Sequence, residues 1–169
     1  MAGVEKVTGV CQVQPSVGYL THLYIFHSDL LIDQDNWSEA LQRSLTTLKL
    51  PNGSVVYDIR AMAKQMTFRE LPQQTADGLS VAVSIEATYR GTEGVFDWTK
   101  GQQKRRWGAI FRDTLGQCYM AGIGFNGFKM VITHNVTERN GFNLTLTGLF
   151  VDRPWRIINT DIDLIIAAL

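Results

Sequence analysis

The strongest constraint on the fold is a stretch of alternating residues, "GLSVAVSIEATYRG", at positions 78–91. Apolar or aromatic side chains occupy every second position from Leu79 to Tyr89, and mostly small or polar side chains lie between them. A period of two is typical of a β-strand with one buried and one wetter face. Because the pattern is about twice as long as the usual strand of about 5–6 residues, the strand should cross a whole sheet or project beyond it.

Seven other segments have strand patterns, and the C-terminal segment could be either a strand or a short helix. The expected strands lie at residues 21–27, 54–59, 65–71, 105–113, 117–123, 127–135 and 141–151, and the C-terminal element lies at residues 156–169. Turns join consecutive strands, which favours antiparallel pairing. We therefore expect one mainly β domain over residues 1–169, built as an antiparallel β-sandwich or a rolled β-barrel.

One helix and one long loop should interrupt the strands. Four apolar residues recur at helical spacing, namely Trp37, Leu41, Leu45 and Leu48. Asp and Asn residues before them suit a helix N-terminus, so one α-helix is predicted at about residues 36–48. Residues 91–105 contain three glycines and no clean period, which predicts a long loop.

The triplet Asn-Gly-Phe occurs twice, at residues 126–128 and 140–142. Asn-Gly is a strong signal for a tight hairpin turn, because both positions tolerate positive φ. The two triplets therefore predict a three-stranded meander of segments 117–123, 127–135 and 141–151. The alternation changes phase at Gly148, which predicts a bulge there.

Composition gives no global case for binding to nucleic acid or a membrane. Sixteen Lys and Arg residues balance sixteen Asp and Glu residues, and the pI is about 6.8. Charged residues make up 19% and hydrophobic residues 45%, which favours a chain that buries surface by assembling. The N-terminus has no apolar signal-peptide core, and no apolar run reaches about 18 residues. Neither a signal peptide nor a membrane span is therefore expected.

The sequence contains no recognisable catalytic or metal-binding pattern. His22 and His27 are five apart on an expected strand, so they should point to opposite faces and cannot share a metal. "GIGFNG" at 122–127 resembles a phosphate loop, but a strand pattern follows where that motif needs a helix. Asp161 and Asp163 lack the further ligands of a calcium loop. We therefore expect no enzyme activity, no cofactor and no metal.

A basic cluster that includes two tryptophans lies at the end of the long loop. Its members are Trp98, Lys100, Lys104, Arg105, Arg106, Trp107 and Arg112. Three interpretations stay open: a solvated loop, a docking surface for a protein partner, and a site where single-stranded nucleic acid stacks on the tryptophans. Acidic residues concentrate at 29–39 and 152–163, and opposite patches on one chain suit head-to-tail contacts.

The string "FRDTLGQCYMAGIGFNGFKMVITHN…RNGFNLTLTGLFVDRPW", over roughly Arg112 to Trp155, combines a polar turn, a strand ending in Ala-Gly, Asn-rich turns and a closing Gly and Arg-Pro. With the long β pair, the long loop and the helix, it resembles the bacteriophage tail-tube fold that contractile injection systems share. The resemblance implies a structural virion protein whose copies form stacked rings around a lumen. It implies a homo-oligomer that contacts other tail proteins, with nucleic acid only as lumen cargo and no membrane partner.

On this interpretation the protein would be located in the virion, after assembly in the host cytoplasm. The candidate subunit interface comprises Trp98, Lys100, Lys104, Arg105, Arg106, Trp107, Asp161, Asp163 and Leu164. Two alternatives remain. One is a β-barrel that binds a small ligand inside, and the other is a single-stranded nucleic acid-binding protein that uses the loop with Trp98 and Trp107.

Overall fold

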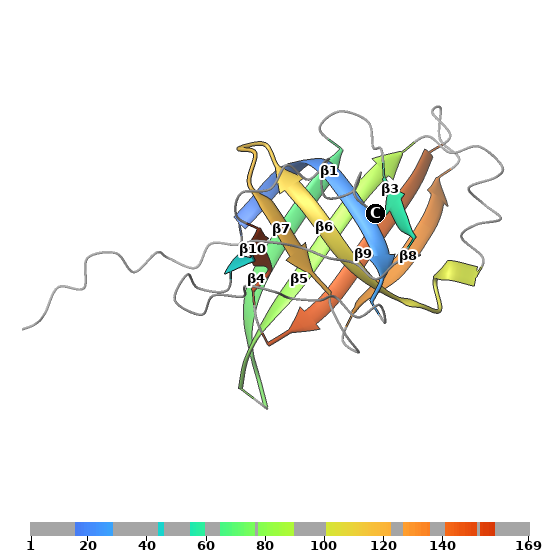
Figure 1. The fold of residues 1–169 in the computed structure, drawn as a ribbon. Helices are drawn as coiled ribbons and strands as arrows, with labels where there is room; N and C mark the ends of the chain where they lie inside the picture. Colours follow the sequence, from blue (N-terminus) through green and yellow to red (C-terminus); the bar gives the residue numbers. More distant parts are fainter. Residues whose placement is uncertain are drawn as a thin grey trace, which may run out of the picture.

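The computed structural model describes residues 16–28, 44–45, 55–59, 65–76, 78–89, 101–122, 127–135, 141–151 and 153–157, and the strands in them form one sheet (Figure 1). The strands are β1 (Ser16–His27), β2 (Ser44–Leu45), β3 (Val56–Asp58), β4 (Met66–Thr75), β5 (Gly78–Tyr89), β6 (Arg106–Asp113), β7 (Cys118–Ala121), β8 (Phe128–Asn135), β9 (Gly141–Phe150) and β10 (Trp155–Ile157). Each of the eight strands expected from the sequence is present, although several bounds differ.

The sheet closes on itself because β1 pairs with β6 as well as with β4. The circuit β1–β6–β8–β9–β5–β4 forms a six-stranded barrel in which all neighbours are antiparallel. β7, β10 and β2 extend from β6 outside this circuit, and the β10–β2 pair is parallel. The mainly β fold is thus confirmed, and the rolled barrel is the architecture observed.

The barrel interior is a packed core. The inner face predicted for β5 is confirmed, since its residues Val81, Val83, Ile85 and Ala87 are buried. Large side chains from the other strands fill the space beside them, including Trp107, Phe111, Phe128, Met130 and Leu144. A barrel of about eight strands is just wide enough for side chains to fill, so six strands leave less room still.

The two halves of the barrel differ on the outside. On β1, β6 and β7, the outward residues Tyr24, Phe26, Ile110 and Met120 are buried as deeply as the core. On β4, β5, β9 and β8, no outward side chain that the structure describes is buried. One half of the outer surface is therefore covered, and the other half is open.

The predicted helix at about residues 36–48 is wrong near its C-terminal end. Ser44–Leu45 form β2 and pair with Arg156 and Ile157 of β10. Pairing with a strand distant in sequence overrides the helical spacing of Leu45. The rest of that segment lies outside the described residues, as do most of the loop predicted at 91–105 and the C-terminal element beyond Ile157. Among the residues described, no helix is long and apolar enough to cross a membrane.

The predicted meander is confirmed for β8 and β9 but wrong for β7. β8 and β9 pair from Lys129–Thr147 to Asn135–Gly141. β7 pairs with β6 and β10, not with β8. The same edge of β6 pairs with β8 through Arg106–Trp107 and with β7 further along. The chain between β7 and β8 therefore passes beside β6 instead of turning tightly.

Gly122 and Gly127 allow this connection to approach the backbone of β6. A Cβ on Gly127 would lie 2.4 Å from Ser28 Oγ and 2.9 Å from the carbonyl oxygen of Trp107. A Cβ on Gly122 would lie 2.6 Å from that same oxygen, and Gly122 has a φ of 78° that other residues rarely adopt. These two glycines serve close packing, neither a phosphate loop nor a hairpin turn.

Gly127→Ala is therefore expected to destabilise the protein by about 1–3 kcal/mol, the usual cost of overpacking. Gly101→Ala is the matched control, because no atom lies within 4 Å of the added methyl group. Urea denaturation of both variants checks the prediction. A Gly127→Ala midpoint equal to that of the unmodified protein would contradict the close approach to β6.

The bulge predicted at Gly148 is wrong. β9 pairs with β5 from Phe142 to Phe150 without a register shift. The alternation changes phase because Leu149 points outward, opposite Ala82, and stays half exposed. An exposed leucine on the outer face thus imitates the sequence pattern of a bulge.

β4 is longer than predicted and continues through Pro72 to Thr75 instead of ending at Leu71. β1 pairs with β4 only as far as Glu70, so one edge of β4 has no partner among the described strands beyond that point. A strand can accommodate the missing N–H of a proline at such an edge. β4 and β5 consequently project from the barrel as a long hairpin (Figure 1).

Candidate assembly surfaces

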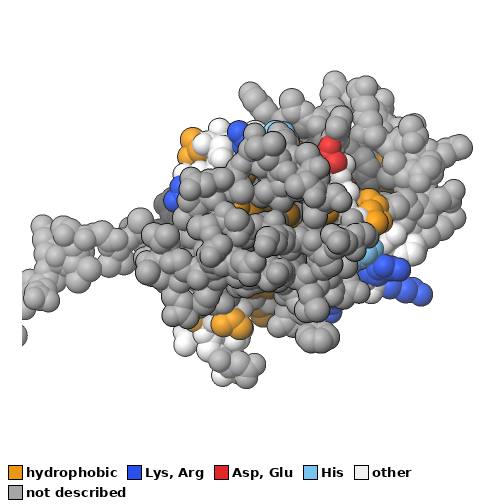
Figure 2. Space-filling model, in the orientation of Figure 1, with side chains coloured by type: hydrophobic (Ala, Val, Ile, Leu, Met, Phe, Trp, Pro, Cys, Tyr) orange, Lys and Arg blue, Asp and Glu red, His pale blue; other side chains and the backbone are white. Residues whose placement is uncertain are grey.

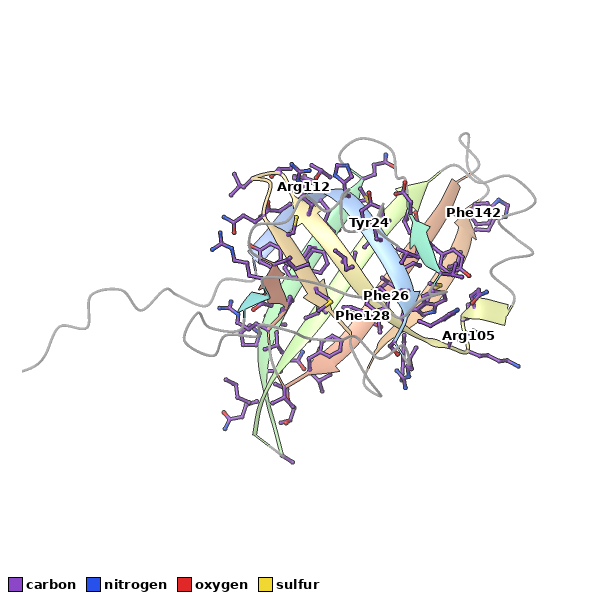
Figure 3. All side chains as sticks on the ribbon, viewed as in Figure 1. Tyr24, Phe26, Arg105, Arg112, Phe128 and Phe142 are labelled. Atoms are coloured by element: carbon purple, nitrogen blue, oxygen red, sulfur yellow. The ribbon has the colours of Figure 1, made fainter. Side chains whose placement is uncertain are left out.

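Three consecutive cations, Lys104, Arg105 and Arg106, are exposed where the chain enters β6. The turn before β6 is fixed in place, because the Arg105 backbone N–H donates to the Gln102 carbonyl at 3.1 Å. The Arg105 guanidinium also donates from Nη1 to Nε2 of His27, at 3.1 Å. Figure 3 places Arg105 at the margin of the barrel. The three charges therefore stand on a fixed segment of the surface.

Trp107 does not belong to that surface. Its side chain is 0% exposed and faces the core, where its ring centroid lies 4.5 Å from that of His27 and 5.8 Å from that of Tyr57. Its indole Nε1–H donates to the Gln102 carbonyl at 3.1 Å. The interface role predicted for Trp107 is therefore corrected: in the folded chain it can contact neither a second subunit nor a nucleic acid base.

The other predicted cations and acids are separated or lie outside the described residues. Arg112 is half-buried near the far end of β6, and Figure 3 shows it at the opposite margin from Arg105. Five predicted interface residues have no structural description, namely Trp98, Lys100, Asp161, Asp163 and Leu164. The described part of the predicted interface is thus Lys104, Arg105 and Arg106.

The alternative sites gain no support from the described residues. His22 lies beside Tyr24 on the outward face of β1, while His27 packs on Trp107 inside, which confirms that the two histidines point apart. No group of three His, Cys, Asp or Glu residues within the described ranges could hold a metal ion. The interior is filled by aromatic and aliphatic side chains, which leaves a small ligand no space there.

The open outer face of β4, β5, β9 and β8 is a surface that the sequence did not identify. Strand register aligns its outward residues in rows across the sheet, with Arg69, Ser84, Thr147 and Lys129 in one row. The next row holds Thr67, Glu86, Thr145 and Val131. Alternation marked the polar positions of each strand, but only long-range pairing assembles them into one surface.

At one end of this face the β4–β5 hairpin carries exposed apolar side chains. Leu79 is 71% exposed on the hairpin, and Val151 is 78% exposed just after β9. Leu149 of β9 is half exposed beside them. Figure 2 shows hydrophobic side chains at the lower margin, close to where the hairpin leaves the barrel in Figure 1. Exposed apolar groups gathered in this way are typical of interaction sites.

Comparison with known proteins gives no relative: no family model, no curated protein and no solved structure matches the chain.

Proposed function

We propose that this protein is a structural subunit that assembles with copies of itself into a ring, as a tail-tube-like component of a phage virion. One observation carries the proposal: three consecutive cations stand exposed on a fixed segment at the start of β6. Fixed charges favour docking over a purely solvated loop, because less side-chain and backbone freedom is lost on contact.

The partner of this cationic segment is proposed to be the acidic part of the next copy. Acidic residues concentrate at positions 29–39 and 152–163 of the sequence, whereas the chain as a whole is neutral. A contact between two different patches on identical subunits is heterologous, and such contacts close into rings when the rotation allows. Electrostatic contacts of this kind should weaken as salt shortens the Debye length from about 10 Å at 0.1 M to about 3 Å at 1 M.

The sequence resemblance over roughly Arg112 to Trp155 supports the phage-tail part of the proposal, with other tail proteins as further partners and the virion as the location. Single-stranded nucleic acid is disfavoured because Trp107 is buried and cannot stack on a base. A ligand inside the barrel is disfavoured because the interior is filled.

Charge reversal tests the cationic contact. Lys104→Glu is expected to raise the concentration needed for assembly by about tenfold or more, because it places like charges opposite each other. Lys129→Glu is the matched control, with the same change of charge at an exposed position on β8, away from the β6 turn. Light scattering during size-exclusion chromatography measures the assembled fraction. Equal effects of the two variants, or no effect of Lys104→Glu, would contradict the proposed contact.

A further inference from the structure

The outer part of the β4–β5 hairpin is a two-stranded ribbon with no core of its own. β1 stops pairing with β4 at Glu70, and β9 stops pairing with β5 at Val81. Beyond these positions, pairing among the described residues joins only β4 to β5, from Leu71–Ala82 to Thr75–Gly78. We call residues 71–80 the arm. A two-stranded hairpin standing alone is marginally stable in water, so the arm gains if something packs against it.

The arm is also poorly suited to permanent contact with water. Its described residues carry no charge, and Asp77 is the single ionisable residue that the sequence places in it. Natural hairpins that remain solvated usually carry charged side chains, which keep the edges from pairing with other chains. The composition of the arm is closer to that of a contact surface.

The arm presents different apolar groups on its two faces. Leu79 lies on the face that continues the inner face of the barrel, in line with Val81. The other face begins with the row Leu71, Ala82 and Leu149, and the exposed Val151 follows two positions after Leu149. The first is a single protruding leucine, and the second is a broader apolar row across three strands. One side chain and one row are shaped to meet each other rather than themselves.

We propose that Leu79 on the arm of one copy packs against the row Leu71–Ala82–Leu149 on the next copy. The inference rests on the proposed ring, because a contact between two different faces of identical arms is heterologous and continues from copy to copy. A second copy is favoured over a foreign protein because this chain carries both halves of the contact. The contact area on each arm is small, so its strength must come from repetition around the ring.

The test exchanges the apolar contact for a charged one. Leu79→Lys and Leu149→Glu, made separately, should each raise the assembly concentration by about tenfold or more, since each buries an unpaired charge. The double variant should recover most of the loss, because each lysine then faces a glutamate of the next copy. Leu115→Lys is the matched control: Leu115 is 82% exposed in the turn between β6 and β7, so this variant should assemble like the unmodified protein.

Each outcome decides between the two proposals. Loss of assembly in both single variants, with recovery in the double variant, supports the arm contact. Assembly of Leu79→Lys at the concentration of the unmodified protein overturns the arm contact and leaves the ring proposal standing. A double variant no better than the worse single variant also overturns it. An unmodified protein that never assembles overturns both proposals, whereas Lys104→Glu reports on the cationic contact independently.

Discussion

Trp107→Ala should lower the free energy of unfolding by about 3–5 kcal/mol, the usual cost of truncating a fully buried tryptophan. Trp107 is completely buried in the barrel, in contact with His27 and Tyr57, and donates a hydrogen bond to the Gln102 carbonyl. Removal of the indole leaves a cavity that the surrounding strands cannot close without breaking their pairing. Urea denaturation followed by circular dichroism measures the change.

Trp107→Phe separates packing from the hydrogen bond. Phenylalanine retains most of the aromatic contact with His27 but leaves the Gln102 carbonyl without its donor, so the expected loss is about 1–2 kcal/mol. A loss of less than about 1 kcal/mol for Trp107→Ala would place Trp107 outside the core. Trp107 would then return to the list of candidate interface residues.

Arg153→Met should cost about 3 kcal/mol, because it leaves the buried carboxylate of Glu70 without its ionic partner. Glu70 is 8% exposed, and the Nε–H of Arg153, which lies between β9 and β10, donates to its Oε1. The estimate is at the lower end of the range for buried pairs because the Arg153 side chain is largely exposed. Glu70 also helps, after burial and Asp113, to raise the pKa of Tyr119.

A double-mutant cycle tests whether charge is the cause. Glu70→Gln/Arg153→Met should be more stable than Arg153→Met by about 1–2 kcal/mol, because no uncompensated charge then remains buried. Thermal unfolding and urea denaturation of all four proteins complete the cycle. If the double variant is no more stable than Arg153→Met, the guanidinium acts by packing alone.

Local patterns in the sequence were sufficient to predict the strands. The period of two from Leu79 to Tyr89 predicted a strand that crosses the sheet or projects beyond it, and β5 does both. The alternation of Trp107, Ala109 and Phe111 predicted a shared face, and all three are buried in the core. The same alternation should have removed Trp107 from the candidate interface, but the neighbouring cations suggested exposure. A strand starts where its alternation starts, whatever the charge of the residues before it.

Contacts between distant segments could not be predicted from single-sequence patterns. Ser44–Leu45 pair with β10, and β7 pairs with β6 instead of β8, because tertiary pairing decides between locally acceptable structures. Gly122 and Gly127 looked like turn residues, although their role is the close approach to the Trp107 carbonyl. The arm emerged only when the pairing showed where β1 and β9 leave β4 and β5.

The mass of the purified protein in solution tests the ring proposal most directly. Light scattering at low salt, with negative-stain images of the same fractions, should show ring-shaped particles whose mass is a fixed multiple of the 19.0 kDa subunit. These particles should dissociate as the salt concentration approaches 1 M, where the Debye length is about 3 Å. A single 19.0 kDa species at every protein concentration and at low salt would contradict the proposal.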